Sequence, residues 1–228
     1  MHDSYTATAT ADIRADAYVE SLMRGMEHTA PTIHVVDDDE AVRDSLGFLL
    51  GTMGWRVRTY PHPPALLAED LPRAGCIITD LRMPAMDGLE LQAALVRRGI
   101  GLPIILMTAH GDVPVAVRAM KAGAVDFLQK PFADTELLEA VHRALERNRD
   151  ALEEAGAAGA ARARIAQLTP REREVLDLVA EGKTNKEVAR ALGTSPRTID
   201  VHRARVLHKL GAENVADLVR MVLAAADG

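Results

Sequence analysis

The stretch C-I-I-T-D at residues 76–80 decides the fold, because a short apolar run ends there in a single carboxylate, Asp80. Runs of this length, with no polar alternation, are typical of strands buried on both faces. Similar runs lie at residues 33–36, 55–60, 104–108 and 125–128, and helical patterns lie at 41–53, 64–71, 88–98, 113–122 and from 134 onward. Five strands alternating with five helices predict an α/β unit with a parallel sheet covered on both faces.

Polar side chains stand at the expected strand ends. Asp37 and Asp38 follow the first strand, Asp80 and Thr108 end the third and fourth, and Lys130 follows the fifth. Ligands of parallel sheets bind outside the carboxyl ends of the strands, so we expect these groups to meet. Clustered carboxylates suit Mg²⁺, and a carboxylate can attack a phosphoryl group while an ammonium neutralises its charge. Any one of these residues could instead be a helix cap or a solvated side chain, so their convergence is what favours a site.

Charge and helix signals change in the last third of the chain. Residues 1–159 hold 15 Lys and Arg against 24 Asp and Glu, a net −9, whereas residues 160–228 hold 12 against 9, a net +3. This asymmetry favours cation chemistry in the first part and a polyanionic partner in the second. From residue 165 the pattern is wholly helical, with start signals at Thr169, Thr184 and Ser195 and a fourth helix at about 214–225. Residues 147–167 indicate a helical linker with a flexible break at Gly156 and Gly159.

The segment 195–210 has the features of a helix that contacts DNA. Ile199, Val206 and Leu210 form a stripe expected to face a core, and Val201 and Ala204 lie on the other side. A face with short side chains flanked by arginines suits the major groove. An ordinary charged surface helix would have a similar composition, so this pattern alone leaves both interpretations open.

Four motifs resemble the receiver domain of two-component response regulators, nearest to the FixJ branch of the NarL/FixJ family. They are V-V-D-D-D-E-A-V-R (35–43), I-T-D-L-R-M-P-A-M-D-G (78–88), M-T-A-H-G-D-V-P (107–114) and D-F-L-Q-K-P-F (126–132). The resemblance implies a flavodoxin-like (CheY-like) fold in which Asp80 is the phosphoacceptor. Mg²⁺ or Mn²⁺ would be bound directly by Asp38, Asp80 and the backbone carbonyl of Arg82, and through water by Asp37. Phosphoryl binding and switching would fall to Thr108, Ala109, Phe127 and Lys130, with a cis Lys130–Pro131 bond.

Three further motifs resemble the LuxR-type helix-turn-helix. They are L-T-P-R-E-R-E-V-L (168–176), E-G-K-T-N-K-E-V-A (181–189) and S-P-R-T-I-D-V-H-R-A-R-V-L-H-K-L-G-A (195–212). By this resemblance, Asp200, Val201 and Ala204 would approach base edges. Phosphates would be held by Thr184, Arg197, Arg203, Arg205 and Lys209.

Together these observations predict four regions: an N-terminal extension (1–31), a receiver domain (32–150), a helical linker (151–164) and an all-α, four-helix DNA-binding domain (165–228). The expected partners are a sensor histidine kinase, double-stranded promoter DNA, a second copy of the phosphorylated chain and RNA polymerase. Val115, Ala119 and Ala122 form one stripe of the helix expected at 113–122 and are candidates for the contact between the two copies. We expect a cytoplasmic, non-enzymatic regulator without a membrane segment. The alternatives are a Mg²⁺-dependent aspartyl-phosphate hydrolase, which would turn over phosphomonoesters, and a degenerate receiver, against which the intact polar strand ends argue.

Overall fold

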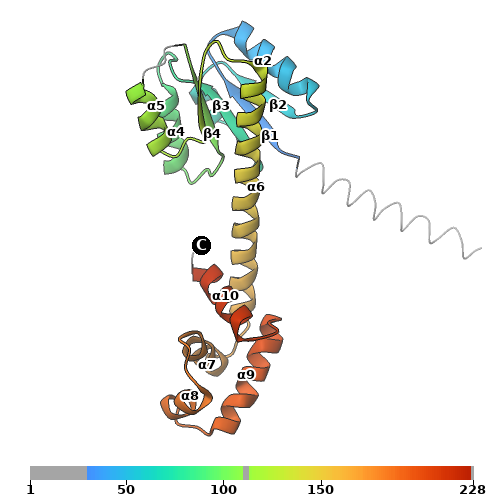
Figure 1. Cartoon of the computed structure of the whole chain (residues 1–228), viewed down its shortest axis with the longest axis vertical. Coiled ribbons are helices and arrows are strands. Elements are labelled where there is room, and N and C mark those ends of the chain that lie inside the picture. The colour runs from blue at the N-terminus through green and yellow to red at the C-terminus, as the bar shows by residue number, and fades with distance from the viewer. Residues whose placement is uncertain (1–29, 110–112, 227–228) are drawn as a thin grey trace, which may run out of the picture. The chain divides into compact units, whose positions relative to one another are not determined.

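A computed structural model describes residues 30–109 and 113–226 (Figure 1). The predicted N-terminal extension at 1–31 lies outside these ranges except for residues 30 and 31, and so does His110 of the third receiver motif. The first unit holds a five-stranded parallel sheet of order β2-β1-β3-β4-β5. Its elements alternate as predicted: β1 (Thr32–Val36), α2 (Glu40–Thr52), β2 (Arg56–Tyr60), α3 (Pro63–Leu67), β3 (Gly75–Asp80), α4 (Gly88–Arg97), β4 (Ile104–Thr108), α5 (Val113–Lys121), β5 (Asp126–Gln129) and α6 (Asp134–Ile165).

Helices cover both faces of the sheet, as the strand patterns predict (Figure 1). Leu50 of α2 and Leu137 of α6 pack with Ile33 and Ile78 on one face. Helices α3, α4 and α5 cover the other face. Strands β1, β3 and β4 are buried throughout, which explains their unbroken apolar runs.

The chain divides into two compact units at Arg149 and Asp150. Helix α6 crosses that division, and the flexible break predicted at Gly156 and Gly159 is wrong, because α6 is unbroken from Asp134 to Ile165. A glycine costs a helix only about 1 kcal/mol relative to alanine, and the surrounding Ala, Glu and Arg residues favour helix strongly.

The second unit contains α7 (Pro170–Ala180), α8 (Asn185–Ala191), α9 (Pro196–Leu210) and α10 (Val215–Ala226). Thr169, Thr184 and Ser195 cap α7, α8 and α9, the first two with capping boxes, so all three predicted start signals are confirmed. Ile199, Val206 and Leu210 are buried in the common core of this unit, as their stripe predicts. Within the described ranges no helix is both long and apolar enough to span a membrane.

Candidate functional site

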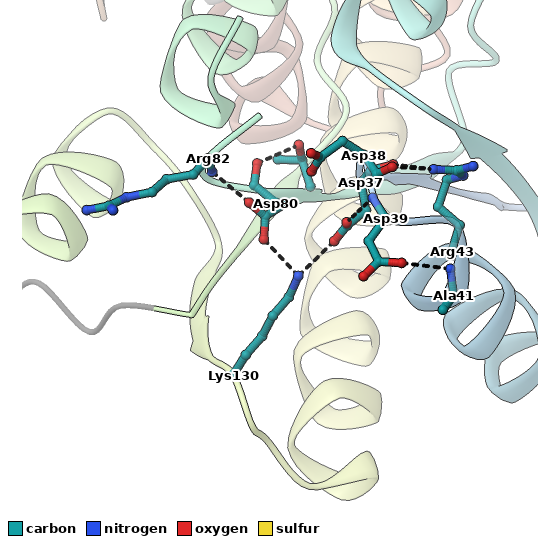
Figure 2. Close-up of polar contacts among 9 residues, drawn as sticks. Asp37, Asp38, Asp39, Ala41, Arg43, Asp80, Arg82 and Lys130 are labelled. Atoms are coloured by element: carbon teal, nitrogen blue, oxygen red, sulfur yellow. Dashed lines mark hydrogen bonds and ion pairs between the residues drawn. The ribbon is translucent and has the colours of Figure 1, made fainter. Parts of the chain in front are cut away.

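The carboxyl edge of the sheet brings the predicted acidic residues and the lysine together (Figure 2). Lys130 Nζ lies 2.7 Å from both Asp37 Oδ2 and Asp80 Oδ1. The two aspartates are buried, and the Lys130 side chain is 24% exposed. Burial lowers the pKa of Lys130, but its hydrogen bonds to Asp37 and Asp80 outweigh this effect and raise the pKa above its ordinary value. The ammonium is therefore charged at neutral pH and offsets the charge of the carboxylates.

Backbone groups hold the remaining carboxylate oxygens. The Arg82 N–H donates to Asp80 Oδ2 at 2.7 Å, and the Asp39 N–H donates to Asp37 Oδ1 at 3.0 Å (Figure 2). Arg43 on α2 donates to the Asp37 and Asp38 carbonyls at 2.8 and 3.1 Å, a positioning role that the sequence analysis did not assign. These bonds orient the loop between β1 and α2 and present both buried aspartates to Lys130.

Two other aspartates, Asp39 and Asp87, cap the helices that begin beside this edge of the sheet. Asp39 caps α2 through the Ala41 N–H, and Asp87 forms a capping box with Glu90 at the start of α4. Because both carboxylates cap helices, we do not assign them to the site formed by Asp37, Asp80 and Lys130.

The predicted switch residues lie on the two strands nearest Lys130. Thr108 is buried at the end of β4, and its carbonyl accepts from the Lys130 N–H at 2.7 Å. Ala109 is exposed immediately after it, and Phe127 on β5 is half-buried against the core under α4 and α5. The Lys130–Pro131 peptide bond is cis, as expected.

The acidic cluster offers oxygen ligands to a metal, although its present geometry favours the ammonium. Asp38 is exposed, and among residues 30–109 and 113–226 no group of three or more His, Cys, Asp and Glu side chains is arranged around a metal position. Asp37 and Asp80 nevertheless already bracket one cation, Lys130. Hard carboxylate oxygens beside a carbonyl are the donors that Mg²⁺ prefers, so the residues fit this ion.

The exposed side of α9 carries the residues predicted to contact DNA. Arg197, Asp200, Val201, Ala204 and Arg205 are exposed, and the 48% exposure of Val201 is high for an aliphatic side chain. Thr184 is also exposed, at the start of α8.

Three of the predicted phosphate ligands have partners within the protein, and the first is Thr184, whose N–H and hydroxyl both donate to Glu187 Oε2 at 2.8 and 2.7 Å. Lys209 Nζ lies 2.7 Å from Glu172 Oε2, and Arg203 donates to the side chain of Asn185. The Lys209 hydrogen bond, with that of the Thr169 N–H, lowers the pKa of Glu172 to about 2. Neither Glu172 nor Asn185 is recognisable from the sequence as a partner of α9, although they lie in the motifs at 168–176 and 181–189.

Helix α5 presents a different face from the one its spacing predicts. Val115, Ala119 and Ala122 were expected to form a dimer contact, but Ala119 is fully buried in the receiver core and cannot do so. The large hydrophobic side chains exposed on α5 are Val113, Val117 and Met120.

A parallel α/β unit with an aspartate–lysine site at its carboxyl edge, followed by a helix-turn-helix unit, is the organisation of a two-component response regulator. Comparison with known families agrees: residues 33–142 match the response regulator receiver domain, and residues 166–222 match the LuxR family of bacterial regulatory proteins.

Known relatives share this organisation over most of the chain. The transcriptional regulatory protein FixJ of Rhizobium meliloti is 48% identical, over 86% of this chain and 97% of its own length. DctR of Rhodobacter capsulatus, a C4-dicarboxylate transport regulator, is 48% identical over 83% of this chain and 98% of its own. The solved structure of StyR covers 85% of this chain and 98% of that one, with 40% identity and a TM-score of 0.73. The chain therefore belongs to the FixJ-like response regulators of the NarL/FixJ family.

Proposed function

We propose that Asp80 accepts a phosphoryl group from a sensor histidine kinase, and that this modification promotes dimerisation and binding to promoter DNA. The observation that carries the proposal is the position of Lys130 Nζ, 2.7 Å from both Asp37 and Asp80 at the carboxyl edge of the sheet. In this proposal, residues 32–150 form the receiver, residues 151–164 form a helical linker and residues 165–228 bind DNA.

The transfer step follows from the placement of the Asp80 carboxylate. An Asp80 oxygen attacks phosphorus, the bond from phosphorus to the donor nitrogen breaks, and the leaving imidazole takes its electron pair, leaving an acyl phosphate on Asp80. The Arg82 N–H fixes Oδ2, so the carboxylate is oriented before the donor arrives. The Lys130 ammonium then turns from the two carboxylates to the oxygens of the phosphoryl group. The backbone at Ala109 and the Thr108 hydroxyl contact the same oxygens.

Mg²⁺, or Mn²⁺ in its place, would be held by Asp37, Asp38, Asp80 and the Arg82 carbonyl. When bound, the ion neutralises negative charge on the phosphoryl oxygens. Asp37 and Asp80 are buried and both lie beside Lys130, so their negative charges require a cation both before and after the transfer.

The second unit supplies DNA binding. Asp200, Val201 and Ala204 face base edges, while Arg197, Arg205 and the start of α8 at Thr184 contact phosphates. Arg203 gives one N–H to Asn185 and Lys209 gives one to Glu172, so the other N–H groups of these two side chains are the ones that would contact phosphates. Dimerisation through the receiver would place two copies of α9 on adjacent half-sites, which raises the affinity without any new base contact.

Labelling with a small phosphodonor tests the proposal. The intact chain with Mg²⁺ and acetyl phosphate should gain the mass of one phosphoryl group, and Asp80→Asn should gain none. Asp39→Asn is the matched control, because it removes one neighbouring carboxylate while asparagine still caps α2. Equal labelling of the Asp80→Asn variant at another residue would refute Asp80 as the acceptor, and steady release of phosphate from phosphomonoesters would favour a hydrolase instead.

A further inference from the structure

We infer that Asn185, at the start of α8, is a positioning residue that sets the base preference of Asp200 on α9. This inference rests on the proposed binding of DNA by α9. Asn185 Nδ2 donates to Asp200 Oδ1, and Asn185 Oδ1 accepts from Arg203 Nη1. One amide thus connects a carboxylate and a guanidinium that lie three residues apart on α9.

The charges of its two partners determine which way the amide faces. The NH₂ group faces the Asp200 carboxylate, and the carbonyl faces the Arg203 guanidinium. The reversed amide would direct its carbonyl at a carboxylate and its NH₂ at a cation, and both contacts would be repulsive. Asn185 therefore has one stable orientation, and that orientation fixes Asp200 and Arg203 together.

Capping bonds and core packing hold the elements that carry this network. The Thr184 N–H and hydroxyl both donate to Glu187 Oε2, at 2.8 and 2.7 Å, which fixes the backbone immediately before Asn185. Val188 on α8 and Ile199 on α9 are fully buried in the same core. The spacing of the two helices is thus set by packing, and the network orients side chains on a fixed frame.

The bond from Asn185 engages Oδ1 of Asp200, so Oδ2 is the oxygen that can accept a hydrogen bond from DNA. A carboxylate only accepts, and in the major groove the base donors are the amino groups of cytosine and adenine. Guanine and thymine present carbonyl oxygens at the equivalent place and would repel it. Held in this way, Asp200 should select cytosine or adenine at one base pair, while Arg203 lessens its repulsion from the DNA backbone.

The test first selects DNA that the unaltered chain binds from a random pool. It then compares the base preferences of intact variants on copies of that DNA randomised at each base pair. Asn185→Asp keeps the size of the side chain and an acceptor for Arg203 but replaces the donor to Asp200 by a carboxylate. Asn214→Asp is the charge-matched control, because the side-chain oxygen of Asn214 accepts from the Asp217 N–H at the start of α10 and an aspartate can do the same. Thermal unfolding of each variant shows whether it is folded.

We expect the unaltered chain to prefer cytosine or adenine at one base pair by about tenfold, within the range of one base contact. Asp200→Asn should abolish that preference, and Asn185→Asp should reduce it to less than about threefold at the same base pair. Asn214→Asp should keep the full preference. Each substitution changes the net charge by one and therefore shifts the affinity for all DNA, so the preference is compared within each protein as the ratio of affinities for the two bases.

Two results would overturn the inference, and a third would overturn the function on which it rests. An unchanged preference in Asn185→Asp would show that Asp200 needs no positioning. A loss of preference at every base pair with a lower unfolding temperature would show a purely structural role. Failure of the unaltered chain to bind DNA would instead refute the proposed function itself.

Discussion

Replacing Lys130 by methionine removes the ammonium between Asp37 and Asp80 and keeps the length of the side chain. Breaking a buried ion pair from one side costs about 3–5 kcal/mol. The Lys130 side chain is 24% exposed, so water screens part of this interaction. We therefore expect Lys130→Met to lower the free energy of unfolding of the receiver unit by about 2–3 kcal/mol, which corresponds to about 10 °C in the unfolding midpoint.

The assay is thermal unfolding with EDTA at neutral pH, followed by the fluorescence of Trp55. This single tryptophan packs against the receiver core and lies edge-on to His142, so it reports on the receiver unit. Added Mg²⁺ should stabilise Lys130→Met more than the unaltered chain, because the ammonium no longer competes for the carboxylates. Lys121→Met, an exposed position on α5, is the control. An unchanged midpoint in EDTA would refute the view that Lys130 stabilises the acidic pair.

Three further changes test other parts of the chain. The hydrogen bond from Lys209 lowers the pKa of Glu172 from its ordinary 4.5 to about 2, so ionised Glu172 stabilises the second unit fully above pH 4.5. This contribution should fade as the pH falls toward 2, and Glu172→Gln should flatten the pH dependence in urea unfolding followed by circular dichroism. An added Cβ at Gly88 would come within 2.7 Å of the Asp80 carbonyl oxygen, so Gly88→Ala should destabilise the receiver by about 1–3 kcal/mol and slow labelling by acetyl phosphate. Met120→Asp should prevent a phosphorylation-dependent dimer in sedimentation if the exposed face of α5 forms the contact, and a dimer of unchanged stability would exclude that face.

The order of elements could be predicted because its signals are local. Strands β1, β3 and β4 are buried on both faces, which requires the continuous apolar runs visible in the sequence. The starts of α7 and α8 follow from Thr169 and Thr184, since each cap and its glutamate stand three residues apart. The convergence of the polar strand ends also follows, because parallel strands place all their carboxyl ends at one edge.

The partners of individual side chains could not be predicted, because they depend on tertiary packing. Lys209 and Glu172 are 37 residues apart in sequence, and Asn185 and Asp200 are 15 apart. A basic residue on α9 therefore resembles a phosphate ligand until α7 and α8 are placed beside it. The continuity of α6 was missed for a different reason: two glycines suggested a break, but the helix propensity of their neighbours is stronger.

The most direct test of the central claim, that phosphorylation of Asp80 controls DNA binding, is one titration of selected DNA with the intact chain. Affinity and sedimentation mass would be measured with and without acetyl phosphate, and with Asp80→Asn as the control. We predict that phosphorylation converts monomer to dimer and tightens binding by about tenfold, or about 1.4 kcal/mol, and that Asp80→Asn responds to neither. Equal mass and equal affinity in the two states of a chain shown to be phosphorylated would contradict the claim.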